Sequence, residues 1–263
     1  MPTNGRSEDQ TCPLVSVVIP FFNRIELAQR AVRSVFAQTY PNIEIIVVND
    51  GSSESDAALV ELFSGRSDLI YIKTRKNVGP GQARNIGIQS SKGRYIAFLD
   101  SDDSWEEDKL KIQVCEMLTK GWSFSHTSYY RHDTASGQTR IVRSGSRNYV
   151  FPLAAFSCRI ATPSVVLDRA LLSDRSFRSD LRFGEDTFLW LALSKRTTLY
   201  GIDRPLAHVF TGELTTAANA TIHSETLQVA REGLEGHRFL LVVHAVYRVF
   251  RKVQKQMSRS WGQ

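Results

Sequence analysis

Short apolar runs alternate with segments of helical periodicity along the first part of the chain. The apolar runs are rich in β-branched residues, as in strands buried on both faces, and cover residues 14–20, 43–49, 69–74 and 94–100. The helical segments between them have apolar residues three and four positions apart, and cover residues 26–36, 56–63 and 82–90. This alternation predicts an α/β fold with a Rossmann-like, mainly parallel central sheet and helices on both faces.

The second half of the chain has a less regular pattern. It predicts strands at residues 122–130, 163–167 and 198–202, and helices at residues 106–119 and 185–195. The polar stretch 131–147 between them predicts a hairpin or a mobile loop. A further helical pattern covers residues 224–257 and is expected to break near 233–236.

The composition is that of an ordinary soluble globular protein. The 263 residues are 42% hydrophobic and 23% charged, which suits one α/β domain with or without an appendage. The formal net charge of +6 is uneven, because basic residues gather toward the C-terminus. Such an excess is compatible with a nucleic acid, an anionic membrane surface or a phosphorylated ligand.

Cysteine usage and the N-terminal residues favour a cytoplasmic protein. Cys12, Cys115 and Cys158 are far apart and form no Cys-x-x-Cys pair, which argues against a disulfide framework or a zinc site and favours a reducing compartment. Residues 1–13 are polar and lack the apolar core of a signal peptide. The chain also has no run of about 18 uncharged apolar residues, the length that a transmembrane helix needs.

Polar side chains follow three of the predicted strands at their carboxyl ends. These are residues 20–23 (PFFN), 49–52 (NDGS) and 100–103 (DSDD). In a parallel α/β sheet, ligands bind beyond the carboxyl ends of the strands. The sequence therefore predicts that these three groups converge on one cleft.

The acidic cluster at 100–103 has two interpretations. Asp100 and Asp102 are two residues apart, and they can present hard oxygen ligands of the kind that Mg²⁺ or Mn²⁺ favours. Alternatively, Asp103 or Ser104 caps a helix that begins near Trp105, where acidic residues suit the helix dipole. The cluster taken alone favours the capping interpretation, and the two interpretations are compatible with each other.

Three further positions can carry chemistry. Asp50 stands in a turn sequence, and its carboxylate can also accept a hydrogen bond from a base or a ribose. The glycine-rich stretch 77–87 lacks the third glycine of a dinucleotide fingerprint, but Arg84 could reach a diphosphate from the helix that follows. Glu185 and Asp186 begin a predicted helix, where they either suit its dipole or present a general base.

Five segments, taken together and in order, resemble one known family. They are VSVVIPFFNR, IIVVNDGSS, NVGPGQARNIG, FLDSDD and GEDTFLW. The ordered set resembles the family 2 glycosyltransferases of the GT-A fold, especially the bacterial enzymes that build surface polysaccharides such as lipopolysaccharide and capsule. The resemblance covers roughly residues 14–216.

The resemblance implies a nucleotide-binding role for several residues. Pro20, Phe21 and Asn23 would line the nucleotide pocket. Asp50 would hydrogen-bond the base, which is usually uracil in this family, and Arg84 would approach the nucleotide.

The resemblance also implies the metal ligand and the catalytic base. Asp100 and Ser101 would lie near the ribose of the donor. Asp102 would be the main ligand of Mn²⁺ or Mg²⁺, and Asp186 would be the catalytic base with Glu185 beside it.

The chain departs from the family pattern at two places. Phe22 stands where a tyrosine is common. Residues 208–211 (HVFT) replace a frequent Tyr-Arg-x-His pattern, and we expect His208 to be structural rather than a metal ligand.

The implied activity is an inverting, metal-dependent transfer of a sugar from a nucleotide-sugar donor, typically a UDP-sugar. The acceptor would be a hydroxyl of a glycan or of a polyprenyl-diphosphate-linked sugar, and no nucleic acid partner is expected. The chain would divide into a disordered polar tail (1–13), a nucleotide-sugar-binding half (14–103), an acceptor-binding half (104–216) and a basic amphipathic helical segment (217–263).

The C-terminal segment has an apolar stripe with basic residues largely off it. The stripe is formed by Phe239, Leu240, Val243, Val246, Tyr247, Phe250 and Val253, and the basic residues are Arg248, Arg251, Lys252 and Lys255. Such a helix can lie in an anionic membrane interface, or it can pack on the catalytic domain or on a second copy in a homodimer. The family context favours peripheral contact with the cytoplasmic face of the inner membrane.

Two alternative functions fit these residues less well. A sugar-nucleotidyltransferase would carry a glycine- and lysine-rich loop directly after the first strand, where this chain has residues 20–24 (PFFNR). A non-catalytic nucleotide-binding or membrane-docking module would not need both Asp102 and Asp186.

Overall fold

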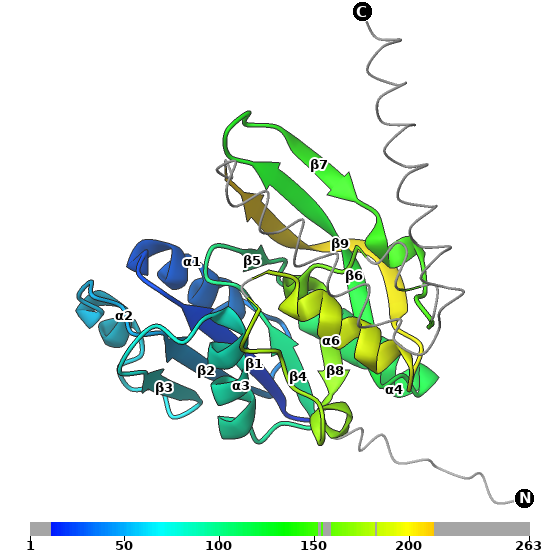
Figure 1. Ribbon diagram of the computed structural model, residues 1–263, viewed down its shortest axis with the longest axis horizontal. Coiled ribbons are helices and arrows are strands. Elements are labelled where there is room, and N and C mark those ends of the chain that lie inside the picture. The colour runs from blue at the N-terminus through cyan, green and yellow to red at the C-terminus, as the bar shows by residue number, and fades with distance from the viewer. Residues whose placement is uncertain (1–11, 152–153, 155–158, 182, 213–263) are drawn as a thin grey trace, which may run out of the picture.

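A computed structural model describes residues 12–151, 154, 159–181 and 183–212 of the chain. These residues form a nine-stranded sheet in the order β3-β2-β1-β4-β8-β6-β9-β5, with β7 paired to β6. Helices cover both faces of the sheet (Figure 1). The predicted α/β architecture is therefore confirmed.

The first half of the sheet is parallel, as the alternating pattern predicts. Its strands are β1 (Val15–Phe21), β2 (Ile43–Asn49), β3 (Leu69–Lys73) and β4 (Tyr95–Phe98). They are connected by α1 (Ile25–Phe36), α2 (Ala57–Leu62) and α3 (Pro80–Ser90). Because β-strands buried on both faces carry unbroken apolar runs, the sequence located these strands to within a few residues.

The second half of the sheet is mixed. Its elements are β5 (Ser104–Trp105), α4 (Lys109–Lys120), β6 (Phe124–Asp133), β7 (Thr139–Val142), β8 (Val166–Asp168), α6 (Glu185–Ser194) and β9 (Tyr200–Thr211). Strand β8 is antiparallel to both β4 and β6, whereas β6 and β9 are parallel. Residues 131–147 include an antiparallel hairpin of β6 and β7, so the hairpin alternative is the correct one.

The expected helix cap at Asp103 or Ser104 is wrong. Ser104 and Trp105 form β5, which pairs antiparallel with β9, and α4 begins only at Lys109. The Asp103 carboxylate accepts a hydrogen bond from the backbone N–H of Phe210 at 2.9 Å. Strand β9 extends to Thr211, well beyond the predicted end at residue 202, and this added length gives residues 104–105 a strand partner in place of a helical turn.

Two apolar cores lie on opposite faces of the sheet. On one face, β1 residues such as Val17 and Ile19 pack with α1, α2 and α4. On the other, Val18 and Phe98 pack with α6 through Trp190, and α3 packs on β2. Since successive side chains of a strand point to opposite faces, β1 contributes to both cores and brings its carboxyl end between the two layers of helices.

Within the ranges that the structure describes, no helix is both long and apolar enough to cross a membrane. The C-terminal segment 217–263 and its predicted helix at 224–257 lie outside these ranges, as does most of the predicted tail 1–13.

Candidate active site

A cavity of about 1030 Å³ opens where β1, β2 and β4 end. It is lined by every residue that the sequence assigned to nucleotide or metal binding: Pro20, Phe21, Asn23, Asp50, Arg84, Asp100, Ser101 and Asp102. The expected convergence of three strand ends on one cleft is therefore present. The roles of the individual residues in binding remain predictions.

Asp50 fixes the loop at Val78 and Gly79, which forms part of the cavity wall. Its side chain is buried, and its two carboxylate oxygens accept hydrogen bonds from the backbone N–H groups of Val78 and Gly79 at 2.7 and 2.9 Å. The adjacent Gly51 has a φ of +70°, and a Cβ there would lie 2.5 Å from the backbone of Lys76. Since a carboxylate has about four acceptor positions, Asp50 can fix this loop and still accept a bond from a ligand.

A strained turn at Asn23 and Arg24 also lines the cavity. Asn23 and Arg24 both have positive φ angles, of 54° and 56°, which are uncommon for non-glycine residues and cost backbone strain, less so for asparagine. The Asn23 N–H donates to Ser52 Oγ at 2.8 Å, and the Arg24 N–H donates to Glu54 Oε2 at 2.9 Å. These bonds tie the end of β1 to the loop after β2, and both turn residues line the cavity.

Arg84 links helix α3 to the end of β4 and to the start of α6. It is buried, and its guanidinium donates to Asp100 Oδ1 at 2.5 Å and to Glu185 Oε1 at 2.7 Å. Burial alone would lower the pKa of Arg84, but the charges of Asp100 and Glu185 outweigh it and raise this pKa. Arg84 lines the cavity while its donors on two sides are engaged by carboxylates.

The carboxylates of the acidic cluster at 100–103 lie in two different environments. Asp100 and Asp102 line the cavity, whereas Asp103 is buried and bonded to β9. The main-chain carbonyl of Asp102 accepts a hydrogen bond from Arg30. Burial, followed by the negative charge of Asp100, raises the pKa of the Asp102 carboxyl, so a cation in the cavity would stabilise its ionised form.

The residues present fit a divalent metal of the magnesium type. In the described part of the chain, no group of three or more His, Cys, Asp or Glu side chains could hold a metal ion by itself. Mg²⁺ commonly binds through one or two carboxylates and completes its shell with water and substrate phosphate. A carboxylate such as Asp102, next to Asp100 in an open cavity, is a donor set of that kind.

Asp186 is not among the residues that line the cavity. Its Oδ2 accepts a hydrogen bond from Thr162 Oγ1 at 2.9 Å, and its Oδ1 accepts one from the backbone N–H of Thr187 at 2.6 Å. Its neighbour Glu185 is buried and paired with Arg84. The carboxylate of Asp186 is therefore oriented from the start of α6, and Glu185 is engaged as a partner of Arg84.

Residues 16–178 match the profile of the family described as glycosyl transferase family 2. The chain belongs to this family. An uncharacterized glycosyltransferase of Rickettsia bellii is 41% identical to it over 215 residues, covering 81% of this chain and 31% of the relative. The chain thus spans less than a third of the length of that relative.

Two shorter relatives match over most of their length. The Escherichia coli UDP-Glc:α-D-GlcNAc-diphosphoundecaprenol β-1,3-glucosyltransferase WfgD is 34% identical, over 72% of this chain and 73% of the relative. The putative teichuronic acid biosynthesis glycosyltransferase TuaG of Bacillus subtilis is 30% identical, over 74% of this chain and 78% of the relative.

The fold is shared with a solved structure. The crystal structure of S. aureus TarS 1-349 in complex with UDP-GlcNAc has a TM-score of 0.68 and 18% sequence identity, over 84% of this chain and 66% of TarS. The expected GT-A fold is therefore confirmed. Membership of glycosyl transferase family 2 also argues against the sugar-nucleotidyltransferase alternative.

Helix α3 of this family 2 glycosyltransferase has a packing role that the sequence did not reveal. Asn85 Nδ2 donates to the Phe177 carbonyl at 2.8 Å, and the Phe177 N–H donates to Asn85 Oδ1 at 2.9 Å. A Cβ on Gly81 would lie 2.7 Å from the Arg178 carbonyl. The glycine-rich stretch 77–87 thus lets α3 approach residues 177–178, which brings Glu185 within reach of Arg84.

Several residues that line the cavity are not among the site residues predicted from the sequence. They are Phe22, Arg24, Asn77, Gly79, Pro80, Ala83 and Phe183. Phe22 is 46% exposed, and its position among the polar strand-end residues 20–23 is the signal that could have identified it. An exposed ring at the cavity mouth is suited to stacking against a base.

His208 is engaged within the protein. Its Nε2 lies 2.8 Å from Glu106 Oε1, and its Nδ1 lies 2.9 Å from His132 Nε2. Both ring nitrogens thus have protein partners, in agreement with the expected structural role.

Proposed function

We propose that this family 2 glycosyltransferase moves a sugar from a UDP-sugar to a hydroxyl of a glycan or lipid-linked acceptor in the synthesis of a bacterial surface polysaccharide. The observation that carries the proposal is the single cavity at the strand ends, lined by Asp50, Asp100 and Asp102. The named activities of WfgD and TuaG and the UDP-GlcNAc complex of TarS support it.

The donor would lie along the cavity with its base toward Asp50. The base would stack on Phe22 and hydrogen-bond the Asp50 carboxylate, which retains acceptor capacity. Ligand pockets commonly enclose about 300–1,000 Å³, so a cavity of about 1030 Å³ is large enough for a nucleotide with an attached sugar.

Asp102, with Asp100 and Ser101 beside it, would hold Mn²⁺ or Mg²⁺ against the diphosphate of the donor. A bound divalent ion stabilises negative charge that develops on the departing diphosphate. Arg84 would keep Asp100 oriented toward the ribose, since one of its donors is committed to that carboxylate.

Asp186 would act as the general base. The acceptor oxygen forms a bond to the anomeric carbon while the bond from that carbon to the diphosphate oxygen breaks, and the nucleoside diphosphate leaves with the electron pair. Asp186 takes the hydroxyl proton as the oxygen attacks. A single displacement of this kind inverts the anomeric centre. The hydrogen bonds from Thr162 and Thr187 support the role, because they hold the Asp186 carboxylate in one orientation.

Residues 14–103 would bind the donor and residues 104–216 the acceptor. Peripheral contact with the inner membrane through residues 217–263, and homodimer formation, stay predictions because that segment lies outside the described ranges.

The test is release of UDP from UDP-sugars, measured with Mn²⁺ and with EDTA. The wild-type protein should hydrolyse its donor slowly with metal and lose this activity in EDTA. Asp102→Ala should lose metal-dependent UDP binding and turnover while remaining folded, because the side chain lines a cavity rather than a core. Asp174→Asn, which removes an exposed carboxylate, is the matched control. Wild-type turnover unaffected by EDTA would refute the metal-dependent mechanism.

A further inference from the structure

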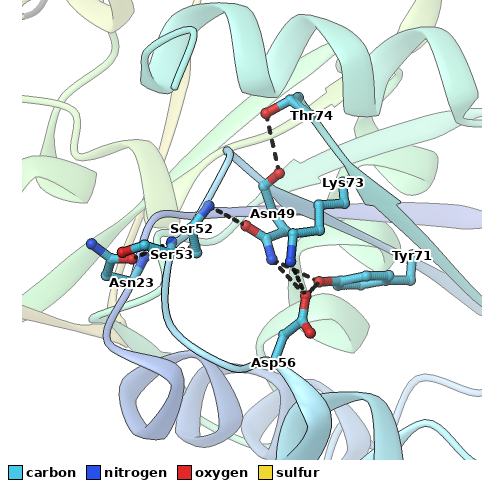
Figure 2. A network of polar contacts seen from close by, with 8 residues as sticks. All are labelled: Asn23, Asn49, Ser52, Ser53, Asp56, Tyr71, Lys73 and Thr74. Atoms are coloured by element: carbon cyan, nitrogen blue, oxygen red, sulfur yellow. Dashed lines mark hydrogen bonds and ion pairs between the residues drawn. The ribbon is translucent and has the colours of Figure 1, made fainter. Parts of the chain in front are cut away.

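One carboxylate oxygen of Asp56 accepts hydrogen bonds from three side chains. Its Oδ2 accepts bonds from Asn49 Nδ2 at 2.9 Å, from Lys73 Nζ at 3.0 Å and from the Tyr71 hydroxyl (Figure 2). The hydrogen bonds from Tyr71 and then Lys73 lower the pKa of Asp56 to about 2. The carboxylate is therefore ionised throughout the range in which an enzyme would be assayed.

Asn49 links the Asp56 carboxylate to the loop that follows β2. Its amide nitrogen donates both to Asp56 and to the Tyr71 hydroxyl, the latter at 2.7 Å. Its amide oxygen accepts a bond from the backbone N–H of Ser52 at 2.9 Å. Asn49 is completely buried. An amide rotated by 180° would turn its NH₂ group against the Ser52 N–H and its oxygen against the Asp56 carboxylate, so both partners favour the observed orientation.

The chain of bonds ends at Asn23 (Figure 2), which lines the cavity. Ser52 Oγ accepts a bond from the backbone N–H of Asn23, and Asn23 Oδ1 accepts one from the N–H of Ser53 at 3.2 Å. Asn23 and Arg24 line the cavity and have positive φ angles, a conformation that surrounding contacts must stabilise. Asp56 itself is not among the cavity-lining residues.

We propose that Asp56 is a positioning residue for the nucleotide donor, acting through Asn49 and Ser52 on the turn at Asn23 and Arg24. The inference rests on the proposed function, because the donor cavity is the site that this turn shapes. Asp56 makes no contact with the donor in this role. It selects one orientation of the Asn49 amide, and that orientation holds the loop to which the strained turn is tied.

The alternative is that Asp56 only stabilises the edge of the sheet, where β3 carries both Tyr71 and Lys73. Asp68 provides a matched control for this alternative. It precedes the same edge strand and also pairs with a cation, Arg66, at 2.6 Å, but it has no part in the chain of bonds that leads to Asn23.

The experiment compares Asp56→Ala, Tyr71→Phe and Asp68→Ala with the wild type, using UDP with Mn²⁺ as the calorimetric probe. Loss of one net hydrogen bond from the chain should weaken UDP binding and raise the KM for the UDP-sugar by about 10-fold in Asp56→Ala. The kcat should change by less than about 2-fold, because the proposed base and metal ligand are untouched. Asp68→Ala should retain wild-type UDP affinity.

A double-mutant cycle with Ser52→Ala tests the route of the effect. If Asp56 acts through Ser52, adding Asp56→Ala to Ser52→Ala should weaken UDP binding little further, because the last link is already lost. Independent, multiplicative effects would overturn the proposed route, and unchanged UDP binding in both Asp56→Ala and Tyr71→Phe would overturn the positioning role. Should Asp56→Ala not fold, Tyr71→Phe and Ser52→Ala decide the outcome. Wild-type protein that binds no UDP would instead refute the proposed donor.

Discussion

Replacing Arg84 with methionine should leave a buried carboxylate without its counterion. Arg84 Nη1 bonds Glu185, whose side chain is 8% exposed, and Nη2 bonds Asp100, whose side chain is 28% exposed. Removing one partner of a buried ion pair costs about 3–5 kcal/mol. Asp100 can recover hydration from the cavity, so we assign the cost mainly to Glu185 and expect a loss of unfolding free energy in this range.

The loss should depend on pH. In the wild-type protein, burial raises the pKa of Glu185, the charge of Arg84 opposes the rise, and Asp186 adds to it. Without Arg84 the pKa of Glu185 rises further. The folded variant therefore retains a proton at pH values where an unfolded glutamate, with its ordinary pKa of about 4.3, has released it. The stability of the variant should therefore fall as pH rises above about 4 and be partly regained on acidification.

The assay is urea unfolding at about pH 5.5 and about pH 8, with two comparison variants. Arg196→Met removes an exposed partner of Asp174 and should cost at most about 1 kcal/mol. The double variant Arg84→Met with Glu185→Gln should recover most of the loss and its pH dependence, because it removes the stranded charge. If Arg84→Met is no less stable than Arg196→Met, or if Glu185→Gln gives no rescue, the assignment of the buried pair is refuted.

Two further predictions concern catalysis and the C-terminal segment. Asp186→Asn should retain UDP affinity but lose transfer by a factor of about 10²–10⁴, the usual contribution of a general base; an equal fall in calorimetric donor affinity would make Asp186 a binding residue instead. Truncation after Gly236 should abolish co-sedimentation with anionic liposomes, which the full chain should show more strongly at low salt than at high salt, without reducing UDP affinity. The membrane assignment is refuted if the full-length chain does not bind the liposomes or if the truncated chain unfolds.

The parallel half of the sheet and the convergence of its strand ends follow from local sequence. The short, β-branched apolar runs of β1 and β2 are typical of strands covered on both faces, and this pattern depends on neighbouring residues alone. The motifs at 20–23, 49–52 and 100–103 stand directly after strands, so the topology of a parallel sheet brings them to one edge.

The tertiary structure decided how the acidic residues are used. Asp103 resembles a helix cap in sequence, but it bonds Phe210 of β9 instead, because a strand more than a hundred residues away in the chain pairs with residues 104–105. Glu185 stands beside the proposed base, yet its carboxylate is bonded to Arg84. Asp56 resembles an ordinary residue before a short helix, and only the packing of β3 against β2 brings Tyr71 and Lys73 to it. In each case the deciding partner is distant in sequence, and local propensity carries no information about which distant groups the packed core will bring together.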